Sequence, residues 1–249
     1  MKIFLTGVLI FLAVLGSVPA RAQGAADRVK ETFGQAVEAY KKGDYETAVR
    51  LNSSILEAGV ESAALHYNLG NSYLRSRQIG RAIASYLRAH RLSPGDMDVL
   101  ANLNYARSMV SAPPSAGKKQ LWSVPFERLS VDELRWGALY IFMFSATVVL
   151  VGLYAGWKRR KVWAWGIAGG LLSVYLTIGV FSRLAVESVM GVCVAAAEVK
   201  FEPAPQATTY YKLPEGSEIR ILREKEGWLK IERSDHKAGW ITAGSISRI

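Results

Sequence analysis

The chain has 249 residues, a formal net charge of +10 and a single cysteine, Cys193. One cysteine excludes an internal disulfide framework. Four of the ten net positive charges lie in one short run, residues 158–161, between two apolar segments. The basic excess is therefore mostly a signal of membrane topology, and this argues against nucleic-acid binding.

A signal peptide is predicted over residues 1–22. Lys2 supplies a short basic start, residues 3–18 are uncharged and apolar, and Ala20-Arg21-Ala22 fits the A-x-A cleavage pattern. The pattern predicts cleavage after Ala22 and export of the chain that follows. An uncleaved signal anchor is the alternative, and it gives the same topology.

An internal repeat follows. The segment at residues 40–48 recurs in degraded form at residues 74–82, a spacing of 34 residues, which is the period of the tetratricopeptide (TPR) helix-turn-helix repeat. We predict a TPR domain over residues 23–110. It would contain two repeats, at about 29–62 and 63–96, and a capping helix at 98–110.

The second repeat matches the TPR pattern more clearly than the first. Gly70 and Ala82 would permit close approach of the two helices, Tyr73 and Tyr86 would fill the space around them, and Pro94 would end the second helix. Arrays of this kind usually need about three repeats for stability. We therefore expect support from a partner or from the membrane-proximal segment.

TPR repeats present a concave surface built from the first helix of each repeat. Phe33 and Val37 stand where chaperone-binding TPRs carry a clamp for a terminal carboxylate, which argues against such a clamp here. A mixed aromatic and basic groove suits an extended peptide or a partner's helix. The alternative is that these side chains only pack the solenoid. The candidate protein-binding residues are Tyr40, Lys41, Tyr67, Asn71, Arg75 and Tyr105.

Two apolar segments, residues 137–157 and 162–182, each contain 21 residues without a charge. About 20 apolar residues span the ~30 Å hydrocarbon core of a bilayer, so each segment can cross it as a helix. We predict a linker and interfacial segment at 111–129 and a transmembrane hairpin with helices at 130–157 and 162–182. The alternative is a pair of buried core helices in a soluble protein.

Local signals refine the hairpin. Ser130 and Glu133 have the spacing of a helix capping box. Short loops rich in Lys and Arg stay on the cytoplasmic side, so both soluble domains are expected on the other side. Glycines four residues apart would let the helices approach closely, although Gly is also simply frequent in membrane helices. These glycines are Gly152 and Gly156, and Gly166 and Gly170; the predicted cytoplasmic loop is Lys158, Arg159, Arg160 and Lys161.

After the second span the apolar period changes to two, at residues 218–222, 227–231 and 239–241. Such short alternating runs between turn signals predict a small all-β barrel over residues 191–249. The ending Gly239-Trp240-Ile241 resembles that of bacterial SH3-like domains. This resemblance implies an aromatic cleft for peptides or cell-wall components. Trp240 could instead pack the barrel, and adjacent tyrosines cannot both face inward. The cleft candidates are Tyr210, Tyr211, Trp228 and Trp240.

Residues that could carry out catalysis are scattered. His66, His90 and His236 lie far apart in the sequence, outside any metal-ligand spacing. Cys193 has no second cysteine, and we expect it to be a buried thiol. The sequence therefore predicts a protein that is not an enzyme and that needs neither a cofactor nor a metal.

The order of these parts defines a fold class, a multidomain membrane protein with an α-helical TPR solenoid, a two-helix transmembrane hairpin and an all-β SH3-like barrel. This order resembles the BatE-type members of the Bat aerotolerance family. The resemblance is carried by residues 60–71, the basic loop and the Gly-Trp-Ile ending. It implies a non-enzymatic scaffold of the bacterial inner membrane with both soluble domains in the periplasm.

The same resemblance implies partners. They would be von Willebrand A-domain membrane proteins of the Bat family and, through them, a MoxR-type ATPase, in a complex linked to oxidative or envelope stress tolerance. The alternative function is an envelope sensor whose SH3-like domain binds peptidoglycan or peptides.

Overall fold

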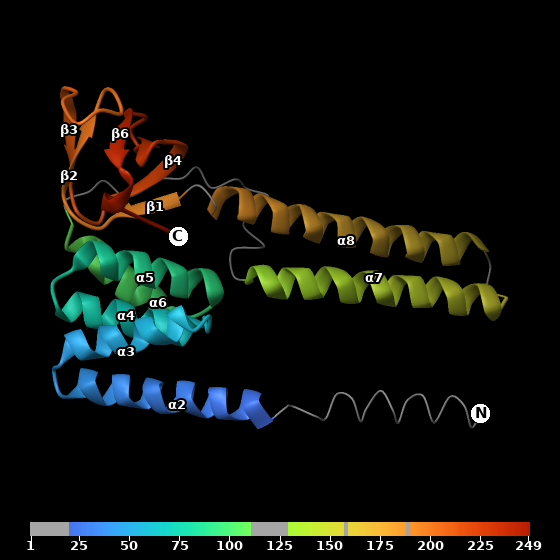
Figure 1. The fold of residues 1–249 in the computed structure, drawn as a ribbon. Coiled ribbons are helices and arrows are strands. Elements are labelled where there is room, and N and C mark those ends of the chain that lie inside the picture. The colour runs from blue at the N-terminus through green and yellow to red at the C-terminus, as the bar shows by residue number, and fades with distance from the viewer. Residues whose placement is uncertain (1–19, 111–128, 157–158, 188–189) are drawn as a thin grey trace. The chain divides into compact units, whose positions relative to one another are not determined.

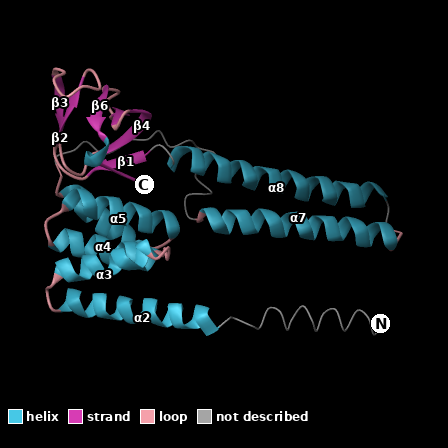
Figure 2. Ribbon diagram, viewed as in Figure 1, coloured by secondary structure: helices cyan, strands magenta, loops and turns pink. Residues whose placement is uncertain are grey.

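The structure, a computed structural model, describes residues 20–110, 129–156, 159–187 and 190–249 (Figure 1). Helices form the first part of the chain and strands the last, as Figure 2 shows. The chain divides into two compact units, residues 1–61 and 62–249. The predicted signal peptide lies outside the described residues apart from its last three positions, and the predicted linker lies outside them apart from Leu129.

The first unit contains a helix pair, α2 (Ala20–Lys41) and α3 (Tyr45–Glu57). Gly43 makes the turn between them with a φ of 82°, a conformation that glycine adopts at no steric cost. Asp44 then caps α3, because its carboxylate accepts a hydrogen bond from the backbone N–H of Thr47 at 3.1 Å. This pair corresponds to the first predicted repeat, although α2 begins ahead of it.

The second unit begins with three helices, α4 (Ala63–Arg75), α5 (Ile79–Leu92) and α6 (Met97–Ser108). The hydroxyl of Ser62 caps α4 by accepting from the N–H of Leu65 at 3.2 Å. A Cβ atom on Gly70 would lie 2.5 Å from Cε1 of Tyr86. The close approach predicted at Gly70 is therefore confirmed, and Tyr86 is the side chain that requires it.

Two further helices, α7 (Val131–Tyr154) and α8 (Arg159–Glu187), pack along one another. Both are long and apolar enough to cross a membrane. The capping box is confirmed, since the Ser130 hydroxyl accepts from the Glu133 N–H at 3.1 Å and the Glu133 carboxylate accepts from the Ser130 N–H at 2.6 Å. The predicted loop at 158–161 needs correction. Its last three residues already lie in α8, as expected of Lys and Arg, which are good helix formers.

Glycines allow the two apolar helices to approach, but not with the predicted four-residue spacing. A Cβ on Gly166 would lie 2.6 Å from Cγ2 of Val149, and one on Gly169 would lie 2.5 Å from Cβ of Ser145. Among the described residues, nothing lies within 4 Å of the equivalent position on Gly170. The Ser145 hydroxyl also donates to the Gly166 carbonyl at 3.2 Å. Contacts at spacing three therefore replace the predicted pair of Gly166 and Gly170.

Replacing Gly169 with valine is expected to destabilise the hairpin by about 1–3 kcal/mol, because the new side chain would overlap Ser145. Thermal unfolding of the full chain in detergent micelles measures this. Gly170→Val is the matched control, with the same chemical change one residue away on a face with open space. Equal effects of the two substitutions would contradict the predicted helix contact.

The last part of the second unit is one antiparallel sheet of seven strands in the order β3-β2-β6-β5-β4-β1-β7. Three of these strands confirm the three predicted alternating runs. Within residues 190–249 no pairing joins β3 to β7, so the sheet is not closed and the predicted barrel is not shown. The strands are β1 (Met190–Cys193), β2 (Ala197–Lys200), β3 (Thr209–Leu213), β4 (Glu218–Lys225), β5 (Trp228–Glu232), β6 (Ala238–Thr242) and β7 (Ile246–Arg248).

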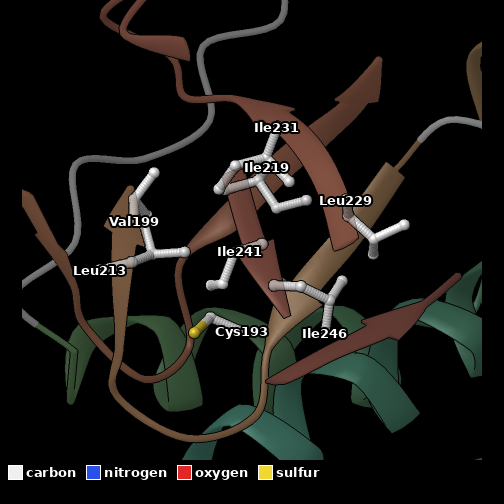
Figure 3. Close-up of a cluster of buried hydrophobic side chains, with 8 residues drawn as sticks. All are labelled: Cys193, Val199, Leu213, Ile219, Leu229, Ile231, Ile241 and Ile246. Atoms are coloured by element: carbon white, nitrogen blue, oxygen red, sulfur yellow. The ribbon is translucent and has the colours of Figure 1, made fainter. Parts of the chain in front are cut away.

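Alternating residues of these strands form the core of the sheet. The side chains converge from different strands, as Figure 3 shows, and they are Cys193, Val199, Leu213, Ile219, Leu229, Ile231, Ile241 and Ile246. The prediction of a buried thiol is confirmed, and burial raises the pKa of Cys193 to about 11. Ile241 rather than Trp240 belongs to this cluster, so the packing interpretation of Trp240 needs correction.

Candidate functional site

Two predicted groove residues, Tyr67 and Asn71, lie one turn apart on α4 and are half-buried. The Asn71 side-chain oxygen accepts a hydrogen bond from the hydroxyl of Tyr86 on α5 at 2.7 Å. The Tyr67 hydroxyl accepts one from the side-chain amide of Asn102 on α6 at 2.8 Å. The rings of Tyr67 and Tyr86 are 6.1 Å apart. Both side chains are therefore held in place by the neighbouring helices before any partner binds.

Two more predicted groove residues lie at the edge of this surface. Tyr105 is 58% exposed on α6, one turn after Asn102, and residues three apart on a helix are neighbours. Arg75 is exposed in the last turn of α4. The second unit thus holds Tyr67 and Asn71 in place by hydrogen bonds, and it carries the exposed ring of Tyr105 and the basic side chain of Arg75 one helical turn from these contacts.

The remaining predicted groove residues, Tyr40 and Lys41, belong to the first unit. The Tyr40 ring lies 5.4 Å from that of Tyr45 on α3, so Tyr40 contributes to packing of its own helix pair. The Lys41 ammonium group pairs with the carboxylate of Glu38 at 2.8 Å. Both side chains of this ion pair are well exposed, and such pairs contribute little to stability.

One family match falls on the helix pair that carries Tyr67, Asn71 and Arg75. Residues 63–96 match the tetratricopeptide repeat family. The matched range is the second predicted repeat, and TPR repeats suggest a role in binding other proteins. A search of curated proteins found no match to the chain.

We call the surface formed by Tyr67, Asn71, Arg75, Asn102 and Tyr105 the TPR surface. Asn102 is the one of these residues that the sequence prediction missed. It lies outside the matched repeat, on α6. Its side chain also donates to the Asp98 carbonyl at 3.1 Å, which fixes the amide beside Tyr67. The sequence does repeat the pair Asn68-Leu69 as Asn102-Leu103. This recurrence indicates that residue 102 lies on a repeat-like helix, but it does not indicate a contact with Tyr67.

A second candidate surface lies on the sheet. Tyr210 is 41% exposed and Phe201 is 57% exposed, and their ring centroids are 4.5 Å apart. The ring centroids of Tyr211 and Tyr210 are 5.2 Å apart, in an edge-to-face arrangement. Tyr211 also packs against the core of the sheet. The two tyrosines face different surroundings, as predicted for adjacent strand residues. The sequence prediction missed Phe201, which follows β2 in a loop without strand alternation.

The predicted tryptophans lie on the neighbouring strands β5 and β6. Trp228 alternates with the buried Leu229 on β5, and Trp240 alternates with the buried Ile241 on β6. The strand register pairs Lys230 with Trp240, so both tryptophans lie on the face away from the core cluster. Strand β2 pairs with β6 at Lys200 and Trp240, so the tyrosines and the tryptophans belong to one continuous sheet, and a single cleft formed by all four stays a prediction.

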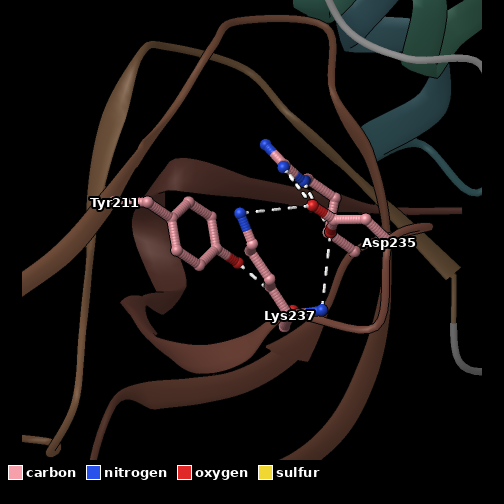
Figure 4. Close-up of polar contacts among 4 residues, drawn as sticks. Tyr211, Asp235 and Lys237 are labelled. Carbon is pink, nitrogen blue, oxygen red and sulfur yellow. Dashed lines mark hydrogen bonds and ion pairs between the residues drawn. The ribbon is translucent and has the colours of Figure 1, made fainter.

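Polar contacts fix the surroundings of Tyr211 (Figure 4). Its hydroxyl donates to the Lys237 carbonyl at 3.4 Å, and the Arg233 guanidinium carbon lies 5.2 Å from the centre of its ring. Arg233 also forms a bidentate pair with Asp235. Burial raises the pKa of Tyr211. The hydrogen bond from Arg233 holds the pKa of Asp235 well below its usual range, and the same bond raises the pKa of Arg233.

The lowered pKa of Asp235 predicts a loss of sheet stability in acid. A carboxyl group whose pKa is lower in the folded state stabilises the fold above its ordinary pKa of about 3.9, and this contribution is lost as the pH falls through the lowered value. We expect Asp235→Asn to lower the melting temperature at pH 7, with a difference from the unmodified chain that shrinks towards pH 2.

Thermal unfolding of the full chain across that pH range tests this expectation. Arg233→Met should reproduce the effect, because it removes the other half of the pair. A difference between Asp235→Asn and the unmodified chain that is equal at pH 2 and pH 7 would contradict the assignment.

Proposed function

We propose that this protein is a non-enzymatic membrane scaffold whose TPR surface holds a protein partner. The observation that carries the proposal is the ordered contact of Tyr67 and Asn71 with Asn102 and Tyr86 in and beside the matched repeat. A binding surface that is already ordered loses little conformational entropy when a partner binds. Tyr105 adds an exposed aromatic ring of the kind enriched in protein interfaces.

Membrane anchoring is the second part of the proposal. The apolar helices α7 and α8 suit a hairpin that crosses the bilayer twice. The basic run at residues 158–161 supports a cytoplasmic position for the connection. A signal peptide at residues 1–22 would agree with this orientation. Both soluble parts would then lie in the periplasm, at the inner membrane of a bacterium.

The third part of the proposal concerns partners. The order of TPR repeat, apolar helix pair and C-terminal sheet supports the resemblance to the Bat aerotolerance family. Candidate partners are therefore membrane proteins with von Willebrand A domains and, through them, a MoxR-type ATPase. The complex would serve oxidative or envelope stress tolerance.

Photo-crosslinking in intact membranes tests the scaffold function. A photoreactive amino acid at Tyr67 in the full chain should give a discrete adduct with another membrane protein, identified by mass spectrometry. The same amino acid at Trp228, on the sheet, is the matched position outside the TPR surface. Asn71→Ala combined with Arg75→Glu should weaken the Tyr67 adduct. Adducts at Trp228 alone would overturn the proposal.

An envelope sensor is the second candidate function, and the exposed pair of Phe201 and Tyr210 favours it. In this case the sheet would be an SH3-like domain that binds peptidoglycan or its peptides through aromatic side chains. The full chain in detergent should then be retained on purified cell wall, and Tyr210→Ala should reduce the retention. Absence of retention by the unmodified chain would rule this candidate out.

A further inference from the structure

Within the second unit, β1 packs against the helices of the TPR repeat. Val192 is fully buried in a cluster whose other members belong to α5 and α6. Val110, Ile249 and other partly buried side chains cover the edge of this cluster. The strand thus covers an apolar helix face that would otherwise be exposed to water. The helix members are Ala82, Ile83, Ala84, Tyr86, Leu103 and Ala106.

Charged side chains surround this apolar contact. The Arg107 guanidinium donates two hydrogen bonds to the Glu218 carboxylate, at 2.6 and 2.9 Å. The Glu218 side chain is only 7% exposed, so its charge depends on Arg107 for compensation. Arg88 donates to the Ser247 hydroxyl at 2.7 Å and to the Arg248 carbonyl.

The sheet also completes the N-terminus of α5. In the described structure the side chain of the N-cap residue Gln78 caps no backbone N–H of the helix, and its oxygen accepts instead from the Arg81 guanidinium at 2.9 Å. Instead, the Glu215 carboxylate accepts from the Gly80 N–H at 2.7 Å, from 135 residues away in the chain. Free N–H groups at a helix N-terminus require an acceptor, and a negative charge there is favourable. Glu215 therefore does for α5 what a local capping residue usually does.

Gly80 shows how closely the two parts meet. A Cβ atom at this position would lie 2.8 Å from Cγ of Glu215 and 2.9 Å from Cα of Val194. The second of these is a backbone atom, which cannot move aside as a flexible side chain can. The chain after β1 thus lies directly on the first turn of α5.

We propose that the C-terminal sheet is the cap of the TPR array and takes the place of a further repeat. TPR arrays need about three repeats and terminal caps, whereas the described residues 97–110 that directly follow the matched repeat contain a single helix, α6. Val192, Glu215 and Glu218 supply the missing cover for α5 and α6. The segments before and after the apolar hairpin then fold as one cooperative body. This role is independent of any partner or ligand.

A single methyl group at Gly80 tests the proposal in the full chain. In an uncovered helix Gly80→Ala would raise stability, because alanine is the better helix former. Under the sheet, the methyl group should push Val194 away and lower the melting temperature by about 4 °C or more. The matched control is Gly34→Ala on α2, where the described structure has nothing within 4 Å; it should keep or raise the melting temperature. An increase for Gly80→Ala would overturn the proposal.

A charge exchange gives a second test that does not depend on Gly80. Arg107→Glu and Glu218→Arg should each lower the melting temperature by about 4 °C or more, and the double variant should recover most of the loss. The exposed pair of Lys41 and Glu38 is the control, where exchange should change little. A double variant no more stable than either single variant would overturn the proposal. Failure of the scaffold function would appear in the crosslinking experiment and would leave these melting temperatures unchanged.

Discussion

Replacing Tyr86 with alanine is expected to lower the free energy of unfolding by about 3–5 kcal/mol. The Tyr86 side chain is completely buried, fills the space opposite Gly70 and bonds to Asn71. Its removal would leave a cavity among α4, α5 and α6 that the surrounding backbone cannot fill. Denaturant unfolding of the full chain in detergent micelles, followed by circular dichroism, measures the loss.

Tyr86→Phe is the control for this prediction. It keeps the ring and removes only the hydroxyl that donates to Asn71, so its cost should be about 0.5–1.5 kcal/mol. The comparison separates packing from hydrogen bonding. If alanine cost no more than phenylalanine at this position, Tyr86 would not be the side chain that holds the repeat together.

The repeat could be predicted from the sequence because its contacts are local. Gly70 and Tyr86 belong to one helix pair, and the 34-residue spacing describes that pair directly. The contacts between the repeat and the sheet leave no such pattern. Arg107 and Glu218 are 111 residues apart in the chain. Gly80 by itself suggests only a weak helix start, and its reason becomes visible when Glu215 and Val194 lie beside it.

In the candidate sites, too, local positions could be predicted from the sequence, whereas contacts between separate elements could not. Tyr67 and Asn71 could be placed on the first helix of a repeat from their position in the period, whereas the contact of Tyr67 with Asn102 depends on how α6 packs. On β6, Trp240 and Ile241 are both apolar, and alternation alone does not say which of them faces the core. The register with β5 places Ile241 beside Leu229 and Trp240 beside Lys230.

The sheet should be as sensitive as the repeat to loss of a central side chain. Ile231 is fully buried on β5 and lies between Ile221 on β4 and Gly239 on β6. Ile231→Ala is expected to lower the free energy of unfolding by about 2–5 kcal/mol, because glycine on one side leaves no side chain to fill the cavity. Denaturant unfolding in micelles, followed through tryptophan fluorescence, measures the change.

Leu222→Ala on β4 is the matched control, since Leu222 is an aliphatic strand residue that is 46% exposed; its effect should stay within about 0.5 kcal/mol. Similar losses at the two positions would contradict the assignment of Ile231 to the core. A sheet that caps the TPR repeat gives Ile231→Ala a further consequence. When the weakened sheet opens, Val192 leaves α5, and the helices should unfold in the same transition as the strands.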